Sequence, residues 1–196
     1  MIVSRWLWEN AWSLVVLLPH LVTQVASPTI EEHSMINARV SVPTPINESI
    51  LTYAPDSPEK QALKNQLEQF ASSAIEIPMI IGGRDVMTGN LGQCILPHDH
   101  RQAIATYHKG DASSVRQAIQ AAAEARADWA NMPWEARSAI FLKAAELLAG
   151  RYRPILNAAT MLNQSKTVFQ AEIDAACELI DFWRFNAVYA RQFHDQ

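Results

Sequence analysis

Glu172 is the residue of this sequence whose type and setting most directly suggest chemistry. It lies in the stretch QSKTVFQAEIDAACELIDFWRFN, residues 164–186. At a helical step of about 100° per residue, one side of this stretch gathers the apolar residues Val168, Ala175, Ala176, Leu179, Phe182 and Trp183. The other side gathers a solvated acidic set: Asp174, Glu178 and Asp181. Glu172 is the exception, because it projects with the apolar set.

Three interpretations of this carboxylate follow from the residues alone. It can lie close enough to a helix start at Ser165 or Thr167 to gain from the positive end of the helix dipole. It can pair with Lys166 or with another chain segment. It can also face a pocket, where a carboxylate among apolar groups is a candidate functional group. Structural pairs are common, so the residues alone favour the first two interpretations over the third.

Histidines and cysteines are the other candidate groups. His98, Asp99 and His100, with His108, suggest a metal site, but no further ligand falls at a convincing spacing, and a polar turn between two strands explains them better. The two cysteines, Cys94 and Cys177, lie far apart and have no recognisable activating context. We therefore predict no metal site and interpret both thiols as structural or incidental.

Composition excludes several classes of protein. The chain has 196 residues, of which 49% are hydrophobic and 18% charged, with a net charge of −4. These values are typical of a globular protein, and no Lys/Arg cluster indicates a nucleic-acid partner. The apolar run Trp12–Val22 is shorter than the roughly 20 residues that span a bilayer, so we expect no membrane partner. Sparse cysteines favour a reducing compartment.

The first 34 residues differ from the rest. A signal peptide is disfavoured by Glu9 and by Pro19 and His20 in the apolar run, and a transit peptide by the single Arg5. Both alternatives stay open, but we interpret residues 1–34 as a disordered or spurious extension. Met35 is then a plausible start, because the composition becomes ordinary there.

The remaining elements predict a small antiparallel sheet followed by a layer of helices. Residues 35–74 form an extended arm, rich in Pro, Ser, Thr and Asn, and then a helix with Ser57 at its N-cap and Pro58 at its first position. Strands are expected at residues 75–81, in a hairpin through Gly82-Gly83, and at residues 103–108. Four helices follow: one after Asp111 and up to Pro133, then residues 134–149, 154–162 and about 165–193.

Long and distinctive stretches of the sequence resemble those of a known protein family. They are QSKTVFQAEIDAACELIDFWRFNAVYA, EIPMIIGG, GDASSVRQAIQAAAEARADWANMPWEARSAIFLKAAELLAG and NESILTYAPDSPE. From about Val42 to Gln196 the chain resembles the N-terminal part of the Δ1-pyrroline-5-carboxylate dehydrogenases, also called L-glutamate γ-semialdehyde dehydrogenases. This family is the proline-degrading branch of the aldehyde dehydrogenase superfamily.

The resemblance implies an α/β, aldehyde dehydrogenase-like fold of which this chain is an N-terminal portion. Residues 75–196 would be the truncated N-terminal part of the nucleotide-binding domain, without its Rossmann core. The family oxidises L-glutamate γ-semialdehyde to L-glutamate with NAD, through a cysteine thiolate. The family's nucleophile motif and its NAD-binding strands lie beyond the matched region, so we expect no catalytic or cofactor-binding residue here and no activity from the chain as given.

The resemblance also implies a small-molecule substrate, a homo-oligomeric enzyme and the cytoplasm or, alternatively, the mitochondrial matrix. It places the helix of Glu172 near the aldehyde pocket, so a pocket-lining or pocket-shaping role becomes as well supported as a buried structural pair. A second hypothesis is a non-catalytic helical module that binds a full-length relative. In either case the apolar helix faces need a cover, and we expect the isolated chain to be marginally stable or prone to aggregation.

Overall fold

The computed structural model describes residues 41–196. The predicted extension 1–34, the run Trp12–Val22 and the candidate start Met35 therefore lie outside the described residues. The elements are, in chain order, α2 (Pro58–Ser72), β1 (Ile75–Ile77), β2 (Met79–Ile81), β3 (Arg84–Val86), β4 (Leu91–Leu96), β5 (Asp99–His108), α3 (Ala112–Asn131), α4 (Trp134–Ala149), α5 (Arg153–Gln164), α6 (Val168–Ala171), the π-helical turn η1 (Glu172–Cys177) and α7 (Glu178–His194).

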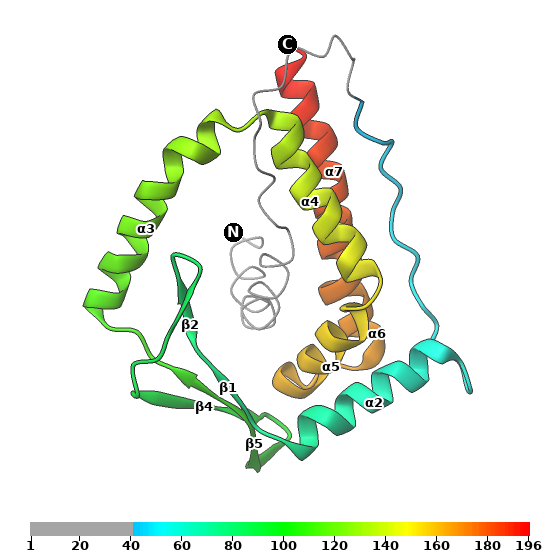
Figure 1. Ribbon diagram of the computed structural model, residues 1–196. Helices are drawn as coiled ribbons and strands as arrows, with labels where there is room; N and C mark the ends of the chain where they lie inside the picture. Colours follow the sequence, from blue (N-terminus) through cyan, green and yellow to red (C-terminus); the bar gives the residue numbers. More distant parts are fainter. Residues whose placement is uncertain (1–40) are drawn as a thin grey trace.

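The predicted arm is extended and runs beside the α4 and α7 helices to the start of α2 (Figure 1). Ser57 caps α2, because its Oγ accepts the Lys60 N–H at 3.3 Å, and Pro58 follows at the first helical position. Proline suits that position because its missing N–H would have no helical partner there. The arm therefore ends where the sequence predicts, and α2 packs against α5.

Two small sheets occur in residues 41–196, and one differs from the prediction of antiparallel strands. The hairpin of β2 and β3 is antiparallel, with Gly82 and Gly83 at positive φ in its turn, as expected. In the other sheet, of order β1-β5-β4, β4 is antiparallel to β5 but β1 is parallel to it. The chain between β1 and β5 is long enough to make the crossover that a parallel pair requires.

The predicted strand of residues 75–81 is in fact two strands. Pro78 separates β1 from β2, because a proline has no N–H to donate to a ladder. The predicted strand of residues 103–108 begins earlier, at Asp99, so the turn between β4 and β5 is Pro97-His98. Neither sheet in the described part of the chain is the doubly wound parallel sheet of a Rossmann core.

Local signals fix most of the helix boundaries. Asp111 forms a capping box with Ser114 at the start of α3, Pro133 separates α3 from α4, and Gly150 follows α4. The predicted helix of residues 165–193 is divided into α6, η1 and α7. The π-helical turn in its middle was not foreseen.

The main core lies where α4, α5, η1 and α7 meet. Its buried residues are Ala145, Leu148, Tyr152, Leu156, Ala175 and Ile180. A second cluster, of Tyr53, Leu63 and Ala158, joins the arm and α2 to α5. The arm is thus part of the packed structure although it has no secondary structure of its own.

By contrast, most of α3 stands away from α4 and α7 (Figure 1), although its end approaches α4, where the ring centroids of Trp129 and Phe141 lie 6.5 Å apart. Val115 and Ile119 on its apolar stripe are 57% and 64% exposed. On α7, Phe182 was predicted to lie with the buried set but is 50% exposed, and Phe193 is 78% exposed. These faces have the composition of surfaces that another part of a protein covers. In residues 41–196 no helix is both long and apolar enough to cross a membrane.

Hydrogen exchange of the 196-residue chain should separate these two regions. Five residues of α5 are buried, whereas Ser114 is the buried residue of α3. Because local opening is easiest where few apolar contacts hold an element, α3 amides should exchange much faster than α5 amides. Mass spectrometry of peptides from the two helices measures the difference. Equal protection of α3 and α5 would contradict this account of the packing.

Candidate functional site

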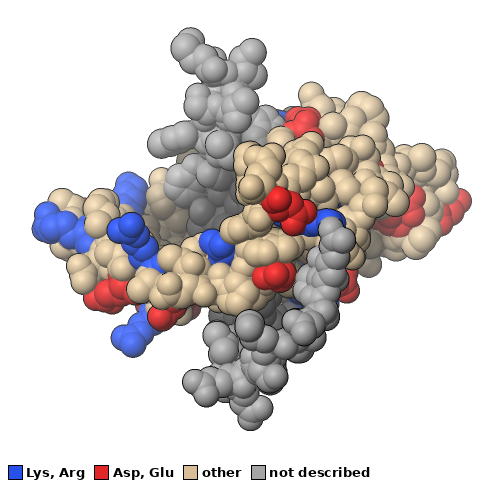
Figure 2. Space-filling view, turned by 90° about the horizontal axis from the view of Figure 1, so that it is seen from above, with Lys and Arg blue, Asp and Glu red and all other residues tan. Residues whose placement is uncertain are grey.

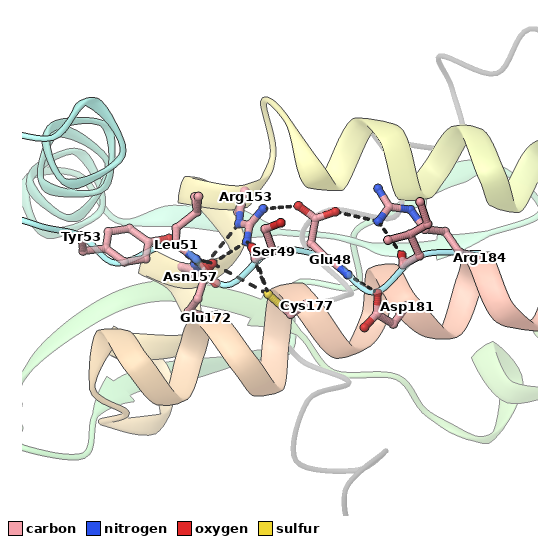
Figure 3. A network of polar contacts seen from close by, with 11 residues as sticks. Glu48, Ser49, Leu51, Tyr53, Arg153, Asn157, Glu172, Cys177, Asp181 and Arg184 are labelled. Atoms are coloured by element: carbon pink, nitrogen blue, oxygen red, sulfur yellow. Dashed lines mark hydrogen bonds and ion pairs between the residues drawn. The ribbon is translucent and has the colours of Figure 1, made fainter. Parts of the chain in front are cut away.

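The π-helical turn η1 sets the geometry of the buried polar cluster. The Glu178 N–H donates to the carbonyl of Ile173, five residues earlier, in place of the usual four. Glu172 and Cys177 are also five residues apart, and both side chains face Arg153 (Figure 3). Such turns are rare in proteins as a whole, and those that occur are often found at functional sites. The local helix register therefore directs a carboxylate and a thiol toward the same guanidinium.

Glu172 is fully buried, and both of its carboxylate oxygens are occupied. Oε1 accepts the backbone N–H of Leu51 at 2.7 Å. Oε2 accepts the Tyr53 hydroxyl and the Asn157 amide, each at 2.8 Å. Arg153 pairs with both oxygens, through Nη2 and Nε. Hydrogen bonds thus satisfy a charge that has no contact with water.

Arg153 is the centre of the cluster, and the side chain is only 5% exposed. It is the first residue of α5, with Pro154 next. Besides Glu172, it binds Glu48 Oε1 at 2.6 Å through Nη1 and the carbonyl of Ser49 at 2.6 Å through Nη2. One guanidinium therefore joins η1 to the arm.

The charges continue along the arm toward α7. Glu48 Oε2 accepts from Arg184 Nη1 at 2.7 Å, so Glu48 bridges two arginines. Asp181 accepts the Glu48 backbone N–H through Oδ1 and the Asn47 amide through Oδ2, each at 2.7 Å. Figure 3 shows Glu172, Arg153, Glu48 and Arg184 as a row of alternating charge between the arm and the helices.

The pKa values show which groups are charged. Burial favours the neutral form of Glu172, but the hydrogen bonds from Arg153, Leu51 and Tyr53 and the charge of Arg153 outweigh it, so its pKa is lowered. The pKa of Tyr53 is raised by burial and by the Glu172 carboxylate beside it. Burial and the charge of Glu172 raise the pKa of Cys177 to about 11. At neutral pH the cluster holds a carboxylate, a phenol and a thiol.

This arrangement can bind and position but offers no nucleophile. Cys177 is buried and protonated, and burial also raises the pKa of Cys94, whereas reactive cysteines are exposed thiolates. Asn157 Oδ1 is buried without a hydrogen-bond partner among residues 41–196. The cluster therefore holds the arm through hydrogen bonds and an ion pair.

The three interpretations of Glu172 can now be compared with its position. Glu172 lies beyond the first turn of α6, where the helix dipole has little effect. Lys166 pairs with Asp174 at 3.0 Å and not with Glu172. Glu172 does pair with another chain segment. Its partner is Arg153, which was not predicted from the sequence. A usable signal was present: Arg153, Asn157 and Thr160 put three polar residues on one buried face of α5.

Glu172 lines none of three clefts that lie on the described residues. One, of about 440 Å³, lies between α3, α4 and α7, and Trp134, Arg137 and Trp183 are among its lining residues. Another, of about 530 Å³, is lined by His98, Ser165 and Lys166, among others. A third, of about 540 Å³, lies between the arm and α4. A role of Glu172 in an aldehyde pocket stays a prediction.

His98 and His108 bind different partners. His98 Nδ1 lies 2.8 Å from Ser165 Oγ, and His108 bonds to Glu76 at 2.8 Å and to the Gly89 N–H at 3.0 Å. In residues 41–196 no three possible metal ligands lie together. On the face shown in Figure 2, most of the described surface is uncharged, and most of the basic side chains lie toward the left of the view.

Comparison with known proteins gives a consistent result. The sequence of the chain is 43% identical over 159 residues to "Delta-1-pyrroline-5-carboxylate dehydrogenase, mitochondrial" of Dictyostelium discoideum, a match that covers 81% of this chain and 28% of the relative. The human protein of the same name is 42% identical over 150 residues, covering 76% and 27%. The chain thus spans less than a third of the length of these relatives.

A solved structure shares the fold. The Delta-pyrroline-5-carboxylate dehydrogenase of Mycobacterium tuberculosis, bound with NAD and cobalamin, superposes with a TM-score of 0.80 at 46% identity, over 83% of this chain and 31% of that one. The fold is therefore aldehyde dehydrogenase-like and partial, as predicted. The sequence profile of the aldehyde dehydrogenase family matches residues 88–196, more than half of the chain. The chain belongs to the aldehyde dehydrogenase family.

Proposed function

We propose that this chain is part of an NAD-dependent dehydrogenase that oxidises L-glutamate γ-semialdehyde to L-glutamate in proline degradation. The observation that carries the proposal is the identity of 43% and 46% to named pyrroline-5-carboxylate dehydrogenases over about four fifths of the chain. Pyrroline-5-carboxylate is the cyclic imine of this semialdehyde, and its hydrolysis gives the open aldehyde. A small-molecule substrate follows from this chemistry.

The described residues do not themselves fit NAD or the nucleophile. A dinucleotide site needs a glycine-rich turn between a strand and a helix N-terminus. The glycines at positive φ here, Gly82, Gly83 and Gly89, lie in turns that lead into strands. Neither cysteine is a thiolate at neutral pH. We therefore propose that residues 41–196 supply a helical layer of the enzyme and that NAD and the nucleophile are held by other residues.

Assembly and compartment follow from the same proposal. The whole enzyme is a homo-oligomer, and it works in the cytoplasm or in the mitochondrial matrix. The names of the Dictyostelium discoideum and human relatives support the mitochondrial alternative. The exposed apolar residues on α3 and α7, among them Ile119 and Phe193, support a role as a layer that the rest of the enzyme covers.

The activity proposal is tested by comparing two proteins. One is the 196-residue chain, and the other is the product of the longest reading frame that contains it. The longer product should reduce NAD⁺ to NADH when given NAD⁺ and pyrroline-5-carboxylate, and the 196-residue chain should form none because it lacks a thiolate nucleophile. NADH absorbance is the measurement, and boiled enzyme is the control. Turnover by the short chain, or none by a folded longer product, would refute the proposal.

A binding experiment tests the second hypothesis, a non-catalytic helical module that binds a full-length relative. If the reading frame ends at Gln196, the folded chain should be mixed with a full-length relative and passed through a sizing column. Co-elution would then favour the interaction module over the enzyme.

Glu172 remains our candidate for shaping the substrate pocket. Both of its oxygens are occupied by protein groups, so we propose that it acts as a positioning residue, through the segments that it joins: the arm, α5 and η1. It would then favour one substrate over another by fixing the wall of the pocket, without touching the aldehyde.

Glu172→Gln in the longer enzyme should therefore change the ratio of kcat/KM between glutamate semialdehyde and a short uncharged aldehyde, by about tenfold if the wall shifts enough to alter relative binding by 1.4 kcal/mol. Asp174→Asn is the matched control, because Asp174 lies on the same turn but pairs with Lys166 and not with Arg153. An unchanged ratio together with a lowered denaturation midpoint would show that Glu172 is a structural pair only.

A further inference from the structure

The arm contacts the helices in the way that a bound extended peptide contacts its receptor. Within the described part of the chain, residues 46–53 pair with no strand and belong to no helix. The polar contacts of this segment go instead to residues 153–184, which are more than 100 positions away in sequence. This segment therefore owes its conformation to the surface formed by α5, η1 and α7.

Side chains of that surface form hydrogen bonds with four backbone groups of the segment. Two carboxylates accept N–H groups: Glu172 takes that of Leu51, and Asp181 takes that of Glu48. Two guanidiniums donate to carbonyls: Arg153 to Ser49 at 2.6 Å, and Arg184 to Ile46 at 3.4 Å. Contacts to the backbone suit any extended chain, as in the known modes of peptide recognition.

Three side chains of the segment supply selectivity. Glu48 lies between the guanidiniums of Arg153 and Arg184 and is 14% exposed. Leu51 packs against the second apolar cluster. The hydroxyl of Tyr53 is held by Glu172 and Asn157. The side chains between them, Ile50 and Thr52, are exposed. The side chains that the surface contacts are thus Glu, Leu and Tyr at relative positions 1, 4 and 6.

The connection to the rest of the chain is exposed and conformationally strained. Residues 54–56 are exposed, and Tyr53 and Asp56 on either side of the turn have φ of 53° and 63°. Non-glycine residues adopt such values at a cost in free energy. The side-chain contacts of residues 46–53 go to α5, η1 and α7, and the turn itself holds a backbone hydrogen bond from the Ser57 N–H to the Ala54 carbonyl at 3.2 Å.

We propose that α5, η1 and α7 form a peptide-binding groove for an extended segment that carries one glutamate, and that residues 46–53 occupy it as an exchangeable ligand. The ligand class is an extended peptide with the pattern Glu-x-x-Leu-x-Tyr. The groove contributes two guanidiniums and two carboxylates, and the peptide contributes the third carboxylate, which lies between the guanidiniums. This inference is independent of the proposed enzyme activity.

The test uses the whole chain with a protease site inserted after Ala54, in the exposed turn. The protein is folded first and then cut, and circular dichroism records whether the helices persist. A fluorescent peptide of residues 43–54 is added, and its anisotropy reports exchange into the groove. We expect the cut protein to stay helical, and we expect the labelled peptide to bind and to be displaced by unlabelled peptide.

Peptide variants test the contacts. Glu48→Gln should weaken binding by about tenfold or more, because hydrogen bonds to charged groups are among the strong ones. Thr52→Ala is the matched control and should bind unchanged, because Thr52 is exposed. In protein carrying Arg184→Met, the difference between the normal peptide and the Glu48→Gln peptide should shrink.

Three results would overturn the inference. The cut protein unfolds, which would show that the covalent link is required. The labelled peptide does not enter a cut protein that remains helical. The Glu48→Gln peptide binds as tightly as the normal one, which would show that the charge row does not select the ligand.

Discussion

The carboxylate of Glu172 has no contact with water, and it can remain ionised there only because Arg153 and three hydrogen-bond donors surround it. Burying a charge without such partners costs several kcal/mol. This requirement constrains three parts of the structure at once. The η1 turn must present Glu172 inward, α5 must begin at Arg153, and the arm must pass close enough for the Leu51 N–H and the Tyr53 hydroxyl to reach the same carboxylate.

The arm completes the charge row and in return is fixed by it. Glu48 shares its two oxygens between Arg153 and Arg184, so the row runs from the end of α6 to the middle of α7. The main apolar core lies directly beside this row, between α4, α5 and α7. Apolar packing and buried charges thus act on the same helices, while α3 and the outer face of α7 remain exposed. A helical layer that is packed on one side and exposes apolar residues on the other fits the partial match to longer aldehyde dehydrogenases.

Sequence patterns predicted the elements whose signals are local. The caps of α2 and α3, the break at Pro133, the turn at Gly82-Gly83 and the burial of Glu172 all follow from a few neighbouring residues. The features that were missed depend on residues far apart. The parallel pairing of β1 with β5, the Arg153 partner and the exposure of Phe182 are set by tertiary contacts that no local period contains. The π-helical turn belongs with them, because one extra residue in a helix turn leaves no mark in composition.

A double-mutant cycle across Glu172 and Arg153 measures the central interaction most directly. Glu172→Gln and Arg153→Met each leave the other, still charged group buried without this opposite charge, so each should lower the free energy of unfolding by about 3–5 kcal/mol. The double variant removes both charges and leaves Glu48 with Arg184, so its loss should be smaller than the sum by about 1–3 kcal/mol. Additive losses in the free energy of unfolding would contradict this central role of the Glu172–Arg153 pair. They would mean that the two charges do not depend on each other.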